Sequence, residues 1–111
     1  MAKCRLVALT NPLPGKEAEY NDWYQNTHLP EVIALPGGVQ AQRFKLVAKL
    51  MGSDENQNLA IYEFECDNPA ELLGAFGQAA QSGKMTPGTA QDMATCYTAL
   101  FVENGEVVKS A

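Results

Sequence analysis

The sequence predicts a single α+β domain, residues 1–111, in which a four-stranded antiparallel sheet carries two helices on one face. Three observations predict it. Segments with strand-like alternation and segments with helical spacing follow one another in the order β-α-β-β-α-β. A short polar loop joins the two central strand segments, as in a hairpin. No linker, repeat or low-complexity tract divides the chain, and its length suits one core.

The first half begins with a strand over Lys3–Thr10, rich in Leu and Val, which turn-forming proline and glycine residues end. A helix is predicted over Lys16–His28, with acidic residues in its first turns, where the helix dipole favours them. Pro30 is expected to end this helix, because the residue before a proline avoids helical dihedrals. One short turn would follow through Ala34, ended by Pro36-Gly37-Gly38.

The second half predicts two strands, over Val39–Leu50 and Leu59–Cys66. Asn68 is suited to cap a helix that starts at Pro69 and reaches Gln81. The last strand is expected over Met93–Val102, and the short tail after it offers an additional edge strand. This order of elements is that of a ferredoxin-like fold.

The second face of the sheet is expected to be covered by another copy of the chain. Two helices cover only one face, so a monomer should show polar residues on the other. Both registers of the last strand are instead largely apolar. An apolar face of this size requires a partner. We therefore expect a homodimer in which two sheets face each other around an enclosed space.

Composition excludes several classes of function. The net charge is −5 and the basic residues are scattered, which argues against binding to nucleic acid or to an anionic membrane surface. No apolar run approaches the length of a membrane span, and no secretory leader pattern is present. Cys4, Cys66 and Cys96 lack metal-site spacing, so free thiols in a reducing cytoplasm are expected. The sequence contains no motif for a metal or a nucleotide cofactor.

The residues best suited to chemistry surround the only histidine. Tyr20, Tyr24 and His28 follow at four-residue intervals and so share one helix face, with Trp23 at its margin. A helix end near Pro30 would raise the pKa of His28, whereas burial would lower it. Glu31 is placed to orient one ring nitrogen. Such an arrangement is typical of a general acid or base.

Simpler interpretations of the same residues stay open. His28 would serve equally as a helix C-cap, and Tyr20 and Trp23 as packing aromatics. Arg43 is a candidate for binding a carboxylate or enolate, or else a surface charge on an outward register. Tyr97 is a candidate for lining a cavity, or else an ordinary strand residue.

The run Trp23-Tyr24-Gln25-Asn26-Thr27-His28-Leu29-Pro30-Glu31, followed by Pro36-Gly37, resembles the signature of the EthD-like branch of the dimeric α+β barrel superfamily. The resemblance covers the whole chain as a fold but only residues 23–37 as a motif, and Lys84–Asp92 matches no family pattern. It implies a barrel of two packed sheets, with a pocket in each subunit between sheet and helices. His28 would correspond to the family's histidine, and Trp23 and Tyr24 to its aromatic pair.

Relatives with this barrel include cofactor-independent monooxygenases, muconolactone-type isomerases, polyketide-processing lyases and dehydratases, and some haem-binding enzymes. The preferred hypothesis is a cofactor-independent enzyme acting on a small aromatic or cyclic molecule. His28 would move a proton, Glu31 or Tyr24 would orient it, and Trp23 would form part of an apolar wall. Tyr20, Arg43 and Tyr97 are further candidates for binding the substrate. Proton transfer (isomerase or lyase type) suits one histidine without a metal, and cofactor-free oxygenation also begins with deprotonation. The alternatives are a non-catalytic small-molecule-binding homodimer and a structural dimer with His28 as a cap.

Overall fold

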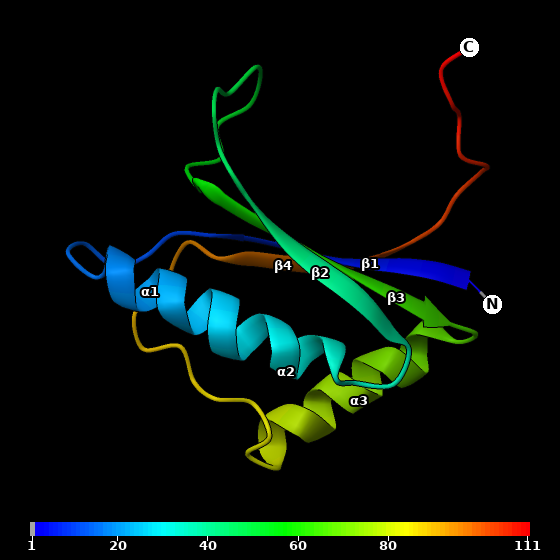
Figure 1. The fold of residues 1–111 in the computed structure, drawn as a ribbon, viewed down its shortest axis with the longest axis horizontal. Coiled ribbons are helices and arrows are strands. Elements are labelled where there is room, and N and C mark those ends of the chain that lie inside the picture. Colours follow the sequence, from blue (N-terminus) through cyan, green and yellow to red (C-terminus); the bar gives the residue numbers. More distant parts are fainter. Residues whose placement is uncertain (1) are drawn as a thin grey trace.

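The computed structural model describes residues 2–111, which form a four-stranded antiparallel sheet with helices on one face, joined by loops (Figure 1). The strands are β1 (Ala2–Thr10), β2 (Gly38–Lys45), β3 (Asn58–Cys66) and β4 (Tyr97–Val102), in the spatial order β2-β3-β1-β4. The helical layer consists of α1 (Glu17–Trp23), a π-helical turn η1 (Tyr24–His28), α2 (Leu29–Ile33) and α3 (Pro69–Gln81). The predicted α+β ferredoxin-like fold is confirmed.

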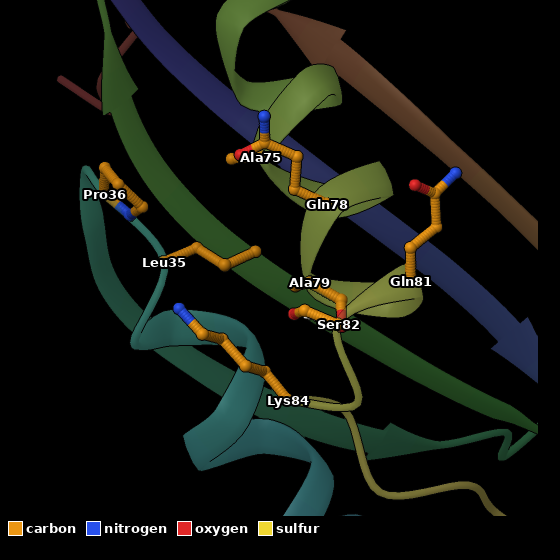
Figure 2. Close-up of a pocket in the computed structure, with 8 residues that line it drawn as sticks. All are labelled: Leu35, Pro36, Ala75, Gln78, Ala79, Gln81, Ser82 and Lys84. Atoms are coloured by element: carbon orange, nitrogen blue, oxygen red, sulfur yellow. Dashed lines mark hydrogen bonds between the residues drawn. The ribbon is translucent and has the colours of Figure 1, made fainter.

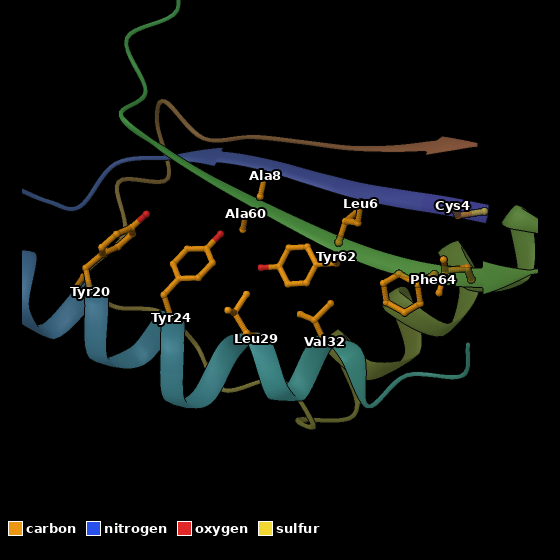
Figure 3. Packing of buried hydrophobic residues seen from close by; sticks show 12 residues of the cluster. Cys4, Leu6, Ala8, Tyr20, Tyr24, Leu29, Val32, Ala60, Tyr62 and Phe64 are labelled. Carbon is orange, nitrogen blue, oxygen red and sulfur yellow. The ribbon is translucent and has the colours of Figure 1, made fainter. Parts of the chain in front are cut away.

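The core lies between the sheet and the helices. Every second residue of β1, from Cys4 to Thr10, is buried. Their neighbours on β3 are small or aromatic, with Phe64 opposite Cys4, Tyr62 opposite Leu6 and Ala60 opposite Ala8. Figure 3 shows these side chains facing Tyr20, Tyr24, Leu29 and Val32 from the helical layer. The helix face of the sheet is therefore the packed face.

Two predicted strands are shorter than expected. β2 ends at Lys45 instead of Leu50, because its last partner on β3 is Asn58, where β3 begins. β4 begins at Tyr97 instead of Met93, because the residues before it form turns and lie beyond the end of β1. The tail after β4 adds no strand among the described residues.

The first helix continues through Pro30, contrary to the prediction. The amide of Leu29 donates to the carbonyl of Tyr24, five residues back, and α2 then begins with Pro30 at its start. An α-helical turn here would crowd the proline ring against the carbonyl of Asn26. The wider π turn accommodates the ring, so helical dihedrals persist to Ile33. His28 thus lies within a continuous helical segment, and its interpretation as a C-cap is wrong.

Two glycines are required where α2 turns into β2. Gly37 has a backbone φ of +88°, a value that residues other than glycine rarely adopt. At Gly38 the constraint is space, because a Cβ atom would collide with the backbone carbonyl of Ile33. These contacts fix the end of the helical layer against the edge of the sheet.

We predict that Gly38→Ala destabilises the fold by about 1–3 kcal/mol, because backbone atoms must move to admit the methyl group. Gly74→Ala is the matched control, since Gly74 lies inside α3 with open space around it. There alanine should stabilise the helix by up to about 1 kcal/mol. Urea denaturation of both variants measures the difference, and equal midpoints would contradict the predicted close contact.

Candidate active site

A cavity of about 410 Å³ lies between the helix face of the sheet and the helical layer. Residues of β1 and β3 form one side, and Trp23, Tyr24, His28 and Val32 form another. The segment 85–96 contributes much of the remaining wall. The volume falls within the range of small-molecule sites, and most of the lining is apolar.

A larger depression of about 540 Å³ lies between the Leu35-Pro36 turn and α3 (Figure 2). Its lining contains one ionisable residue, Lys84, and no aromatic side chain. None of the residues predicted for chemistry reaches it. The smaller cavity is the better candidate, because buried polar groups converge there on an apolar space.

His28 is surrounded by aromatic rings. It stacks on Trp23, with ring centroids 4.5 Å apart and planes 19° from parallel. Tyr24 and Tyr62 meet the imidazole edge-on, at 5.1 Å and 6.1 Å. The π turn explains the stack, because a turn closed over five residues brings side chains five positions apart onto the same side. Trp23 is therefore central to the site, not marginal as the helical wheel predicted.

The environment of His28 favours the neutral form of its imidazole. Burial lowers the pKa of His28 below its ordinary value, and the negative charge of Glu31 opposes this only in part. The Nδ1 atom is buried and has no hydrogen-bond partner. An imidazole that is neutral near pH 7 and not committed to a protein partner can accept a proton from a ligand.

Glu31 does not orient His28 through a hydrogen bond, contrary to the sequence-based expectation. Its carboxylate binds Thr86 instead, accepting from the amide at 2.8 Å and from the hydroxyl at 2.7 Å. These bonds lower the pKa of Glu31, which therefore stays ionised. The indole Nε1 of Trp23 donates to the carbonyl of the same residue at 3.1 Å. The side chains of Glu31 and Trp23 thus bind the backbone amide and the backbone carbonyl of Thr86, respectively.

The segment Lys84–Asp92, which matched no family pattern, lines part of the cavity. Gly88 packs so closely on the indole of Trp23 that a Cβ atom would collide with the ring. The amide of Leu13 donates to Ala90 at 2.7 Å, and the amide of Asp92 donates to Asn11 at 2.9 Å. The segment is therefore anchored to the helix at Thr86 and to the loop after β1 farther along.

Three residues predicted to bind substrate lie away from the cavity. Tyr20 is buried and its hydroxyl is hydrogen-bonded to Thr10. Arg43 points toward the helical layer, not outward, with its guanidinium 5.2 Å from the ring centre of Tyr24 and bound to Asn21. Tyr97 is half exposed on the opposite face of the sheet. None of the three lines the cavity.

Tyr62 is the main cavity residue that the sequence did not single out. It lies on the inward register of β3 and is 1% exposed, yet its hydroxyl has no hydrogen-bond partner. The alternation of β3 groups Tyr62 with Ala60 and Phe64 on one register, but it does not predict that the hydroxyl of Tyr62 lacks a partner.

Within residues 2–111 no group of three or more histidine, cysteine, aspartate or glutamate side chains is placed to hold a metal ion, and no helix is long and apolar enough to span a membrane.

No family model and no curated protein sequence matches this chain, but solved structures share its fold. A proposed monooxygenase from Shewanella loihica PV-4 is similar over 99% of both chains, with a TM-score of 0.60 and 15% identity. An EthD family protein from Bacillus halodurans C-125 is similar over 96% of this chain and 100% of its own, with a TM-score of 0.52 and 17% identity. SnoaB, a cofactor-independent oxygenase from Streptomyces nogalater, is similar over 97% of both chains, with a TM-score of 0.53 and 14% identity. The expected resemblance is confirmed at the level of the fold.

We predict that Glu31→Gln loosens the segment 84–92, because the charged acceptor of both Thr86 bonds becomes a neutral amide with one oxygen. The Thr86 amide should exchange with solvent about tenfold faster, as expected for the loss of about 1.4 kcal/mol. Hydrogen exchange followed by NMR measures this rate. The control is Glu19→Gln, which affects only an exposed contact with Lys16. Wild-type exchange at Thr86 in both variants would show that Glu31 does not hold the segment.

Proposed function

We propose that this chain is a cofactor-independent enzyme that removes a proton from an acidic carbon or hydroxyl of a small aromatic or cyclic molecule. His28 acts as the base. The observation that carries the proposal is a buried imidazole in the wall of a mostly apolar cavity, with no hydrogen-bond partner at Nδ1 and with a lowered pKa. General bases of this kind contribute typically 10²- to 10⁴-fold in rate.

The residues that line the cavity favour the binding of a flat, apolar ligand. Trp23, Phe76 and Met85 present aromatic and thioether surface, and Leu6 and Val32 add aliphatic surface. Aromatic ligands gain from such walls both by burial and by ring contacts. The cavity contains no cationic side chain, so a substrate that is neutral before deprotonation fits it best.

Two outcomes follow from the same first step. The carbanion or phenolate can be reprotonated elsewhere or expel a leaving group, as in isomerisation or elimination, or it can reduce molecular oxygen. Structures with this fold named as a cofactor-independent oxygenase and a proposed monooxygenase support the second outcome. With anthrone as substrate the oxygenation balances as anthrone plus O₂ giving anthraquinone plus water. The methylene carbon of anthrone supplies all four electrons that reduce O₂, so no external reductant is needed.

We predict that the protein catalyses deuterium exchange at the acidic methylene of anthrone in D₂O under nitrogen, measured by NMR after subtraction of the spontaneous rate. His28→Gln should lower the catalysed rate about 10²- to 10⁴-fold, and Gln25→Ala, on the exposed side of the helix, should leave it unchanged. Protonation inactivates a base, so the rate should fall as the pH decreases. Because burial lowers the pKa of His28, this fall should lie below pH 6.5.

The aerobic reaction distinguishes the two outcomes. Oxygen uptake that matches the formation of anthraquinone and is lost in His28→Gln would establish oxygenation, and exchange without uptake would establish a redox-neutral reaction. Saturable binding of anthrone with exchange at the spontaneous rate at every pH would refute the enzyme proposal and leave a non-catalytic binding protein.

We also propose that the chain forms a homodimer through the open face of its sheet. The residues facing away from the helices include Val7, Ile61, Phe44, Tyr97 and Phe101, and the last three are 43%, 49% and 51% exposed. An exposed apolar surface of this kind is typical of an interface between copies of one chain.

We expect the wild-type protein to show a dimeric mass by light scattering at micromolar concentration, and Phe101→Glu to be monomeric, because a carboxylate would be buried without a partner. Leu73→Glu, at a similarly exposed apolar residue on α3, is the control and should stay dimeric. A monomeric wild-type mass would refute the facing-sheet arrangement.

A further inference from the structure

The hydroxyl of Tyr62 is a buried polar group that forms no hydrogen bond within the protein. Tyr62 is 1% exposed, lines the cavity and has no hydrogen-bond partner at its hydroxyl. Tyr20, on the same side of the sheet, shows the usual arrangement, because its hydroxyl is bonded to Thr10. Buried hydroxyls are normally satisfied, and leaving one unpaired lowers stability. An unpaired one in a cavity wall therefore points to a ligand.

The side chains that neighbour this hydroxyl on the sheet are small. Ala60 and Ala8 are the neighbouring inward-facing residues of the sheet, and neither extends beyond its methyl group. Figure 3 shows the hydroxyl of Tyr62 pointing toward Tyr24, beneath Ala60. Tyr24 lines the same cavity, so two phenols lie beside the space that a ligand would occupy.

The chemistry of Tyr62 makes it a donor. Burial raises its pKa far above the ordinary value, and the neighbouring Tyr24 adds to the effect. The phenol therefore stays protonated at any working pH. It is also next to the base, because the ring centroids of Tyr62 and His28 are 6.1 Å apart. One ligand ring in the cavity can contact both.

We propose that the Tyr62 hydroxyl binds the acceptor oxygen of the substrate, a ketone carbonyl or phenolic oxygen conjugated with the carbon that His28 deprotonates. This inference rests on the proposed function. When the C–H bond breaks, the proton moves to the imidazole and the electron pair passes through the conjugated system onto this oxygen. The hydrogen bond from Tyr62 strengthens as the oxygen becomes negative, which favours the enolate. The substrate class is thereby narrowed to aromatic ketones and phenols.

The binding test uses two ligands with the same carbon skeleton. Anthrone has the carbonyl oxygen and 9,10-dihydroanthracene does not, and the fluorescence of Trp23 in the cavity wall reports both. Tyr62→Phe should weaken anthrone binding about tenfold, as for one buried hydrogen bond, and leave dihydroanthracene binding unchanged. The control Tyr97→Phe removes a hydroxyl on the opposite face of the sheet and should change neither affinity. Equal effects of Tyr62→Phe on both ligands would overturn the proposal.

Thermal denaturation separates this role from a structural one. Tyr62→Phe removes an unpaired buried oxygen, so its melting temperature should equal or exceed that of the wild type. Tyr20→Phe breaks the bond with Thr10 and should melt at a lower temperature. A clear loss of stability in Tyr62→Phe, matching that of Tyr20→Phe, would show that the hydroxyl has a partner in the protein and would overturn the inference.

A spectroscopic readout keeps this inference distinct from the proposed function. The carbonyl stretch of anthrone bound to the wild type should lie at lower frequency than that of anthrone bound to Tyr62→Phe. If Tyr62→Phe changes neither the carbonyl stretch nor the affinity for anthrone, while His28→Gln still abolishes exchange, the role of Tyr62 is refuted and the role of His28 as the base is retained. If both respond to Tyr62→Phe but exchange never exceeds the spontaneous rate, the subsite stands and the enzyme proposal fails.

Discussion

The hydrogen bond from the amide of Leu29 to the carbonyl of Tyr24 is the constraint on which the rest of the site depends. It spans one residue more than an α-helical bond and so admits Pro30 without ending the helix. The same wider turn brings Trp23 and His28, five residues apart, into a stack. A local solution to one proline therefore decides which aromatic side chain covers the imidazole. Single π turns of this kind are frequent at functional sites.

The stack in turn fixes the wall of the cavity. With its ring against His28, Trp23 directs its indole N–H to the carbonyl of Thr86, and Glu31 accepts from the amide and hydroxyl of the same residue. The segment that carries Thr86 is then held against the cavity as part of its wall, with Gly88 against the indole ring of Trp23. Glu31 and His28 therefore differ in charge and in their contacts. Glu31 is charged and structural, whereas His28 is neutral and uncommitted.

The predictions that held are those with a local physical cause. The strand over Lys3–Thr10 and the cap at Asn68 each depend on neighbouring residues, and the structure contains both. The prediction that the helix ends near Pro30 was wrong. Proline destabilises an α-helical turn, but a π-helical turn can accommodate its ring. The role expected for Glu31 was wrong because its partner, Thr86, is 55 residues away in the chain. Arg43 was placed on the wrong side because the strand pattern near it is not cleanly alternating.

The order of the elements and the segment that carries the histidine could be read from the sequence, because each follows from periodicity and turn chemistry over a few residues. Which buried polar groups lack a hydrogen-bond partner became visible only in the packed chain. Whether a hydroxyl such as that of Tyr62 finds a partner depends on distances between strands and helices that no local pattern encodes. The same holds for the pKa of His28, since burial is a property of the packed chain.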